Sequence, residues 1–312
     1  MTTRIVPLAL LTALALAACQ SLPSPRAPGL QSTFADIARG DYDNHGQVQA
    51  SRSQADVLPP PHVSVRISDS GRKDWSLWQV RYSSTPAVAV TWAMRQLRDA
   101  DGSVALVPHR ARAPAAGAAA SFEPADWLPL DACALRVAVS GPRNQWQADA
   151  ARCSAIIPGI GTEAAVLPLV VEVEGEWLRI RFNADQARGP DAREDLRRVV
   201  PFTGWAALNG SGPDAAPGSD WHMDRALQLG SEGGRTALAW RDGAASGWSL
   251  MLERPTYRDG SVPVLKLSVV EDASGRTLAY AWANPDATRI GINLGWLQAG
   301  LERASASPAP AD

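Results

Sequence analysis

The most constraining feature of this 312-residue chain is a pattern in which apolar and polar residues alternate over short segments. Residues 63–67, which read VSVRI, show the pattern clearly. Such alternation places one set of side chains on each face of an extended strand. Turn-forming pairs such as Asp101-Gly102 and Glu174-Gly175 separate the segments, as they do in antiparallel hairpins. The chain is therefore predicted to be an all-β protein.

The amino-terminal half contains about seven or eight such segments between residues 63 and 183. A meander of that length closes most economically into an antiparallel barrel, because closure leaves no exposed strand edge. We expect this barrel to occupy residues 32–183, with a short helix before its first strand.

A polar and charged break over residues 184–199 is predicted to be a linker, since Gly189-Pro190 lies in its middle. The strand pattern restarts beyond it, so residues 200–303 are expected to form a second antiparallel β domain. A short helix over residues 294–301 is expected near the end of that domain. Residues 304–312, which read ASASPAPAD, have the composition of a disordered tail.

The amino terminus has the features of an export signal. Arg4 precedes an apolar run over residues 5–18, which is typical of a secretory signal peptide spanning residues 1–18. The run ends in Leu16-Ala17-Ala18-Cys19, which resembles the lipobox of bacterial lipoproteins. The resemblance implies cleavage before Cys19 and attachment of fatty acyl chains such as palmitate to that residue. The alternative is an ordinary signal peptide followed by an unrelated cysteine.

Acylation of Cys19 would hold the mature protein in the cell envelope, since several buried acyl chains anchor firmly. The residue after Cys19 is Gln20 and not Asp, which in bacterial lipoproteins favours sorting to the outer membrane. We therefore expect an outer-membrane anchor facing the periplasm, with surface exposure as an open alternative. The Pro- and Ser-rich residues 19–31 are expected to be the tether.

Export also affects how the two remaining cysteines are interpreted. Cys133 and Cys153 would lie in an oxidising compartment, where a disulfide across a hairpin is favoured. Such a bond would stabilise the fold by about 3 kcal/mol in the chain-entropy model. Two buried free thiols are the alternative. A metal site is not expected, because the sequence has no Cys-x-x-Cys and its four histidines are scattered.

The balance of charge argues against a nucleic-acid partner, since 30 Lys and Arg residues face 32 Asp and Glu residues. The chain has only two lysines, Lys73 and Lys266, and no phosphate-binding Gly-Lys-Ser/Thr motif. It also has no Gly-x-Ser-x-Gly and no His-Glu-x-x-His. No catalytic residue is therefore assigned, and enzymatic activity is not expected.

Several motifs in the first half of the chain follow one another in an order that resembles a known protein family. Phe34-x-x-Ile37-x-x-Gly40-x-Tyr42-x-Asn44-x-x-Gln47 is followed by a strand from His62, a strand with Leu77-Trp78 and a strand with Arg95. The two later cysteines then stand about 20 residues apart. Over residues 34–183 this order resembles the CpcT/CpeT family of phycobiliprotein chromophore lyases. The resemblance implies a lipocalin-like barrel whose cup holds a bilin, and an enzyme that attaches bilins to cysteines.

The sequence departs from that family where the reaction would take place. Residues 92–97 read WAMRQL, whereas the family typically has Tyr-Arg-Gln-Arg-Val-Tyr, so one arginine remains. Residues 78–81 read WQVR in place of Tyr-Val-Glu-Gln, so the acidic position is lost. The resemblance therefore supports the fold more than the reaction.

The candidate ligand site lies on these two strands. Arg95 and Arg81 are suited to pairing with carboxylates, and we expect Arg95 and Tyr82 to face the cavity. Trp78 and Trp92 are expected either to line the cup or to form plain core. Because Trp92 and Arg95 differ in parity, they cannot both point inward without a bulge.

The leading hypothesis is a lipid-anchored envelope protein whose lipocalin-like barrel binds an apolar or amphipathic small molecule, without catalysis. No cofactor is expected beyond a bilin-like or other apolar ligand. One alternative is chromophore-lyase-like activity inherited with the fold. A second alternative is an envelope module that interacts with a protein or a glycan through residues 200–303.

Overall fold

The computed structural model describes residues 34–52, 59–83, 87–98, 103–113, 122–137, 144–210, 212–214, 220–257 and 262–305. The signal peptide, Cys19, the tether and residues 306–312 lie outside the described residues. Within the described ranges, no helix has the length and apolar character needed to cross a bilayer. The described residues belong to one compact unit, Thr33–Asp312.

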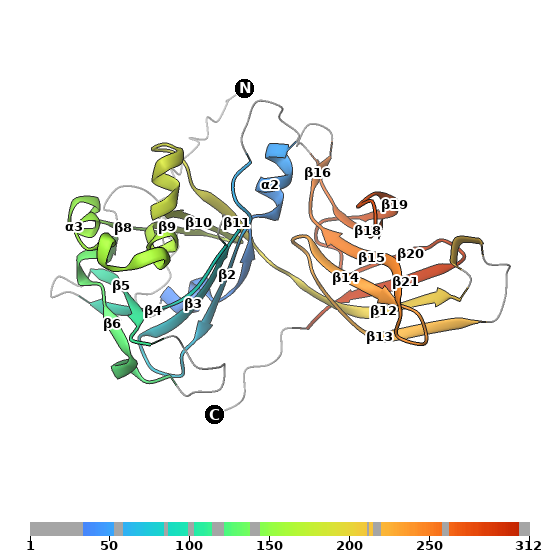
Figure 1. The fold of residues 1–312 in the computed structure, drawn as a ribbon, viewed down its shortest axis with the longest axis horizontal. Helices are drawn as coiled ribbons and strands as arrows, with labels where there is room; N and C mark the ends of the chain where they lie inside the picture. The colour runs from blue at the N-terminus through green and yellow to red at the C-terminus, as the bar shows by residue number, and fades with distance from the viewer. Residues whose placement is uncertain are drawn as a thin grey trace, which may run out of the picture. The chain divides into compact units, whose positions relative to one another are not determined.

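Among the described residues, ten antiparallel strands form a closed barrel (Figure 1). The strands are β1 (Gly40–Asp43), β2 (Val63–Asp69), β3 (Trp75–Tyr82), β4 (Val88–Arg98), β5 (Val104–Ala111), β7 (Leu135–Val137), β8 (Asn144–Ala148), β9 (Pro168–Glu174), β10 (Trp177–Phe182) and β11 (Glu194–Arg198). They follow the order β4-β3-β2-β1-β11-β10-β9-β8-β7-β5, and β5 pairs back with β4. A short strand, β6 (Trp127–Pro129), pairs with β5 beside the closure. The predicted all-β class and barrel are confirmed.

Eight short helices and one longer helix connect or cover the strands in the described ranges. They are α1 (Phe34–Ala38), α2 (His45–Arg52), α3 (Ala150–Ser154) and the 3₁₀ helices η1 (Pro124–Asp126), η2 (Asp131–Cys133), η3 (Ile157–Gly159), η4 (Gly161–Val166), η5 (Asn183–Arg188) and η6 (Gly212–Asp214), of which α2 is the longest α-helix. Helix α1 confirms the expected helix before the first strand.

The barrel interior is filled by the chain's own side chains. Alternation along β3 turns Trp78 inward, where it is fully buried. Phe34 from α1 stacks on that indole with ring centroids 5.4 Å apart. It also meets Trp146 edge-on at 4.7 Å. The interior is therefore a packed core that α1 completes from one end.

The segment expected to be a linker forms part of the barrel. Within residues 184–199, strand β11 pairs with β10 on one side and with β1 on the other. Leu196 points into the core, and Glu194 is fully buried in a polar network. Two of the charged residues that suggested a solvated linker, Asp185 and Glu194, are thus buried and hydrogen-bonded inside the protein, which the local sequence did not reveal.

The described residues beyond β11 form two four-stranded antiparallel sheets and a short hairpin (Figure 1). One sheet has the order β13 (Trp221–Gly230), β12 (Pro201–Asn209), β21 (Leu297–Arg303) and β20 (Arg289–Asn293). The other has the order β14 (Gly234–Ala239), β15 (Ala245–Glu253), β18 (Leu265–Glu271) and β19 (Thr277–Ala283). The hairpin joins β16 (Thr256–Tyr257) and β17 (Val262–Pro263). Buried residues of both sheets form one core, so the two sheets pack as a sandwich.

The prediction of a helix over residues 294–301 is wrong, because strand β21 spans Leu297–Arg303. Leu294, Leu297 and Leu301 match a helical spacing, but Leu297, Ala299 and Leu301 also alternate with less buried residues. Pairing with β12 and β20 selects the strand.

The predicted disulfide between Cys133 and Cys153 is present, with Cα atoms 4.5 Å apart. It joins η2 to α3 and closes the base of the β7–β8 hairpin. Both cysteines are fully buried. Because their sulfur atoms are bonded to each other, the alternative of two free thiols is wrong.

Candidate ligand-binding site

The five residues predicted to bind a ligand do not converge on one cavity. Trp78 and Trp92 pair directly across β3 and β4, and both are fully buried. The Trp92 indole donates to the Val166 carbonyl at 3.0 Å, and Trp78 donates to the Ser76 hydroxyl at 3.2 Å. Both side chains are thus satisfied core residues.

Tyr82 also points inward, but it belongs to a buried polar network. Its hydroxyl donates to Asp185 Oδ1 at 3.2 Å. Burial, together with the nearby Asp185 charge, raises the pKa of the Tyr82 hydroxyl. The phenol is therefore a neutral hydrogen-bond donor at physiological pH.

The expectation that Arg95 faces the cavity is wrong, because Arg95 and Arg81 are exposed on the outer face of the barrel. The β3–β4 register runs without a shift from Val88 to Arg95. Since Trp92 points inward, parity alone directs Arg95 outward. Its guanidinium lies 5.6 Å from the centroid of the Trp75 ring.

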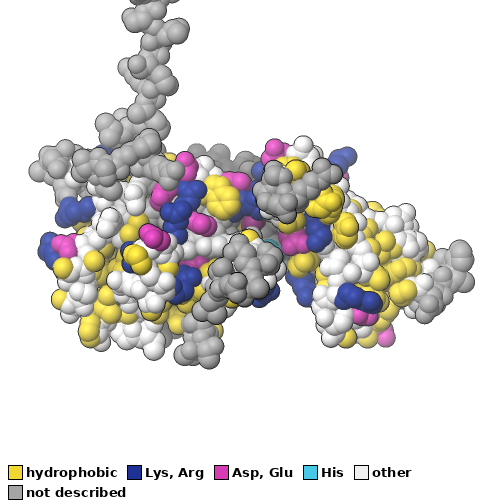
Figure 2. Space-filling view, turned by 90° about the horizontal axis from the view of Figure 1, so that it is seen from above, with side chains coloured by type: hydrophobic (Ala, Val, Ile, Leu, Met, Phe, Trp, Pro, Cys, Tyr) yellow, Lys and Arg dark blue, Asp and Glu magenta, His cyan; other side chains and the backbone are white. Residues whose placement is uncertain are grey.

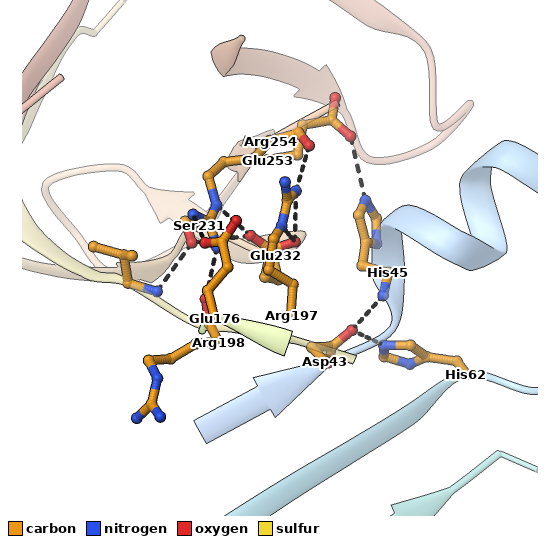
Figure 3. Close-up of polar contacts among 11 residues, drawn as sticks. Asp43, His45, His62, Glu176, Arg197, Arg198, Ser231, Glu232, Glu253 and Arg254 are labelled. Atoms are coloured by element: carbon orange, nitrogen blue, oxygen red, sulfur yellow. Dashed lines mark hydrogen bonds and ion pairs between the residues drawn. The ribbon is translucent and has the colours of Figure 1, made fainter. Parts of the chain in front are cut away.

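A different cluster of charged side chains lies where β11 of the barrel meets the sandwich (Figure 3). Arg254, which follows β15, uses its whole guanidinium there. Its Nε donates to Glu232 Oε1 at 2.5 Å, and its Nη1 donates to Glu176 Oε2 at 2.8 Å. Its Nη2 donates to the Arg198 carbonyl at 2.6 Å. One side chain of the sandwich thereby contacts β11 and the β9–β10 turn.

Glu232 is the shared acceptor of this cluster. Arg197 of β11 donates to Glu232 Oε2 from Nε at 3.1 Å and from Nη2 at 3.0 Å. The Ser231 hydroxyl donates to Glu232 Oε1 at 3.2 Å. The Glu232 side chain is only 1% exposed. Burial raises the pKa of this carboxyl, and Arg254 and Arg197 offset part of that shift.

A second ion-pair group stands beside the first (Figure 3). His45 begins α2, and its Nε2 lies 3.2 Å from Glu253 Oε2. Lys266 Nζ donates to the other oxygen of Glu253 at 2.9 Å. Burial opposes ionisation of Glu253, but hydrogen bonds from His45 and Lys266 lower its pKa. Glycine is required at position 233, because φ is +74° and a Cβ there would lie 2.3 Å from His45 Nδ1.

These groups border a pocket of about 810 Å³ that we call the junction pocket. Its lining residues are Asp43, His45, Gly46, Gln47, Gln49, Ala50, Trp177, Asp195, Arg197, Glu232, Glu253, Arg254, Pro255 and Thr256. Figure 2 shows acidic, basic and histidine side chains gathered where the barrel meets the sandwich. The volume is within the range of small-molecule sites, roughly 300–1,000 Å³.

The junction pocket has walls of two kinds. Trp177, Ala50 and Pro255 supply an apolar wall, and the ion-paired groups supply a polar one. The Arg197 guanidinium lies 5.5 Å from the centroid of the Trp177 ring, which connects the two walls. Such a pocket is suited to a molecule with both apolar and hydrogen-bonding parts.

The sequence did not indicate this site, because its residues are distant from one another along the chain. Glu232 and Arg197 are separated by 35 residues, and His45 and Glu253 by 208 residues. A second pocket of about 280 Å³ lies at the α1 end of the barrel, beside Phe34 and Trp75. Among the residues that the structure describes, no group of three or more His, Cys, Asp or Glu side chains is placed to hold a metal ion.

No protein-family model, curated protein or solved structure matches this chain. The resemblance to chromophore lyases therefore stays a prediction.

Proposed function

We propose that this chain is a lipid-anchored envelope protein that binds an amphipathic small molecule in the junction pocket without catalysing a reaction. The observation that carries the proposal is the pocket of about 810 Å³ with an indole on one side and buried ion pairs on the other. The packed barrel interior argues against a ligand held inside the barrel.

The charged cluster supports binding rather than catalysis. Glu232 accepts hydrogen bonds from two guanidinium groups and one hydroxyl, and Glu253 has both His45 and Lys266 as partners. Groups held in this way present a fixed pattern of charge to a ligand and cost little reorganisation on binding. We infer that the cluster orients the polar part of the ligand.

Binding is tested by titrating purified full-length protein with oleate, haem and biliverdin while tryptophan emission is recorded. Each ligand that enters the junction pocket should alter the emission of Trp177. The response should saturate in the unmodified protein and shrink in Trp177→Phe. Trp221→Phe is the matched control, because Trp221 does not line this pocket.

A response that is unchanged in Trp177→Phe would place the ligand elsewhere. If none of the three ligands changed the emission or bound by calorimetry, the proposal of an amphipathic ligand would be overturned.

The lipid anchor is tested separately in cells that export the protein. Labelled palmitate should enter the mature chain, and Cys19→Ser should abolish the incorporation. If the label is absent from the unmodified protein, the anchor is wrong, whereas the pocket proposal is unaffected.

A further inference from the structure

A second candidate site lies on the outer face of the sandwich sheet that contains β12, remote in sequence from most of the junction pocket. An open groove of about 620 Å³ runs across this face. Trp205 of β12 lines it and is 36% exposed, which is high for so large an apolar side chain. The groove shares no lining residue with the junction pocket.

The sheet itself holds the Trp205 indole flat. Gly300 of β21 pairs directly with Trp205, and Gly291 of β20 pairs with Gly300. A Cβ atom on Gly300 would lie 3.0 Å from Trp205 Nε1 and 3.2 Å from its Cε2. One face of the indole therefore covers the glycine, and the opposite face is left for the groove.

A bulge contributes to this placement. The β12–β13 register shifts between Gly204 and Ala206, so Trp205 stands at the irregularity. Bulges redirect a side chain relative to a regular strand and are common at functional sites. Gly300 beneath the ring and the bulge beside it together fix the orientation of the Trp205 indole on the sheet.

Polar side chains flank the indole on the same face. Thr203, Glu302 and Arg289 form the next cross-strand row, and Arg225 of β13 lines the groove as well. Arg289 Nε lies 3.1 Å from Glu302 Oε1. Glu302 is the one carboxylate among the described residues that line the groove, and it pairs with Arg289. Arg225 therefore supplies the excess positive charge of the groove.

We propose that this groove binds a glycan chain that contains acidic sugars. The C–H bonds on one face of a pyranose ring are complementary to the negative face of an indole. Sugar hydroxyls match the donors and acceptors of Thr203, Arg289 and Glu302, and a sugar carboxylate matches the excess charge of Arg225. A lipid surface is disfavoured, because charged side chains flank the single indole. The groove's open form suits a chain that extends beyond the bound sugars.

The test uses full-length protein and calorimetric titration with oligogalacturonate. A neutral galactan oligosaccharide of equal length is the comparison ligand. Oligogalacturonate should bind more tightly than the galactan, and the difference should shrink at high salt, because screening weakens the charge interaction. Trp205→Ala should reduce the affinity for both ligands by about tenfold or more, as expected for a central aromatic contact.

Two further variants separate the contributions. Arg225→Gln should reduce binding of oligogalacturonate and leave binding of galactan unchanged. Trp282→Ala is the matched control, since Trp282 is an exposed tryptophan on the other sheet and should leave both affinities unchanged. Circular dichroism checks that each variant is folded.

Three results would overturn the proposal: no binding of oligogalacturonate, an affinity that is unchanged in Trp205→Ala, or equal affinity for oligogalacturonate and galactan. Trp177→Phe should leave glycan binding intact, so failure of the junction-pocket proposal is distinguishable from failure of this one.

Discussion

Asn44 donates from Nδ2 to Glu194 Oε2 at 2.7 Å, which joins the end of β1 to the start of β11 across 150 residues of sequence. Both side chains are fully buried. Arg188 pairs with the other oxygen of Glu194 and also with Asp185 at 2.9 Å. Two buried carboxyl groups thus share one guanidinium at the end of the barrel where β11 enters.

This arrangement predicts that stability depends on pH through Glu194. Burial and the nearby Asp185 charge raise the pKa of Glu194 to about 7, although Arg188 and Asn44 oppose the shift. The folded state then holds a proton that the unfolded state releases near its ordinary pKa of about 4.3. The contribution is fully present below that value and is lost as pH rises through about 7. Glu194→Gln should remove this dependence.

The measurement is the free energy of urea unfolding at several pH values between 4 and 8, expressed as the difference between the unmodified protein and Glu194→Gln. That difference should shift in favour of Glu194→Gln by about 3–4 kcal/mol as pH rises, and most of the shift should lie between about 4.5 and 7. Parallel curves would show that Glu194 ionises normally in the folded protein.

Removal of Glu232 should destabilise the contact between the barrel and the sandwich. Glu232→Gln leaves the buried guanidinium groups of Arg197 and Arg254 without their shared carboxylate, which costs about 3–5 kcal/mol. Thermal and urea unfolding measure the loss. Asp220→Asn is the control, because its ion pair with Arg241 is exposed and should contribute less than about 1 kcal/mol. Equal effects of the two changes would contradict the role of burial.

Because the barrel interior is packed, alanine substitutions at Trp78 and Arg95, two residues predicted from the sequence to bind a ligand, should change the free energy of unfolding by different amounts. Trp78→Ala should reduce the free energy of unfolding by about 3–5 kcal/mol, because it opens a cavity in the core. Arg95→Ala, on the outer face, should change it by less than about 0.5 kcal/mol. If Trp78→Ala were harmless, the indole would be lining an open cup instead.

The disulfide predicts a measurable loss of stability on reduction. Replacing both Cys133 and Cys153 by serine should lower the free energy of unfolding by about 3 kcal/mol, because the unfolded chain gains conformational freedom. Dithiothreitol should shift the urea midpoint of the unmodified protein in the same direction. The serine variant should not respond to the reductant, and a response there would point to an effect unrelated to this bond.

Local sequence was sufficient for the fold class. The alternation in residues 63–67 predicted β2, because a strand exposes its two faces at a period of two residues whatever its partners are. The export signal and the two remaining cysteines predicted the bond between Cys133 and Cys153, because an oxidising compartment favours a disulfide across a hairpin. Where local signals were ambiguous, the prediction was wrong. Leu294, Leu297 and Leu301 fit a helix, whereas Leu297, Ala299 and Leu301 fit a strand, and strand pairing selected the strand.

Strand β11 shows a different limit. Its sequence, EDLRR, looks solvated, and only partners such as Asn44 turn Glu194 into a buried residue. Because Trp92 and Arg95 differ in parity along the strand, the sequence indicated that only one of them faces inward. Core packing buries the tryptophan, so Arg95 faces outward.

Period and spacing along the chain therefore determined the strands, the barrel and the cysteine pair, because those features depend on neighbouring residues. The junction pocket and the Trp205 groove were decided by tertiary structure alone. Arg197, Glu232 and Arg254 come from separate strands and turns, and the floor under Trp205 comes from a strand far along the chain. No periodicity encodes such distances, since they arise only when sheets pair and pack.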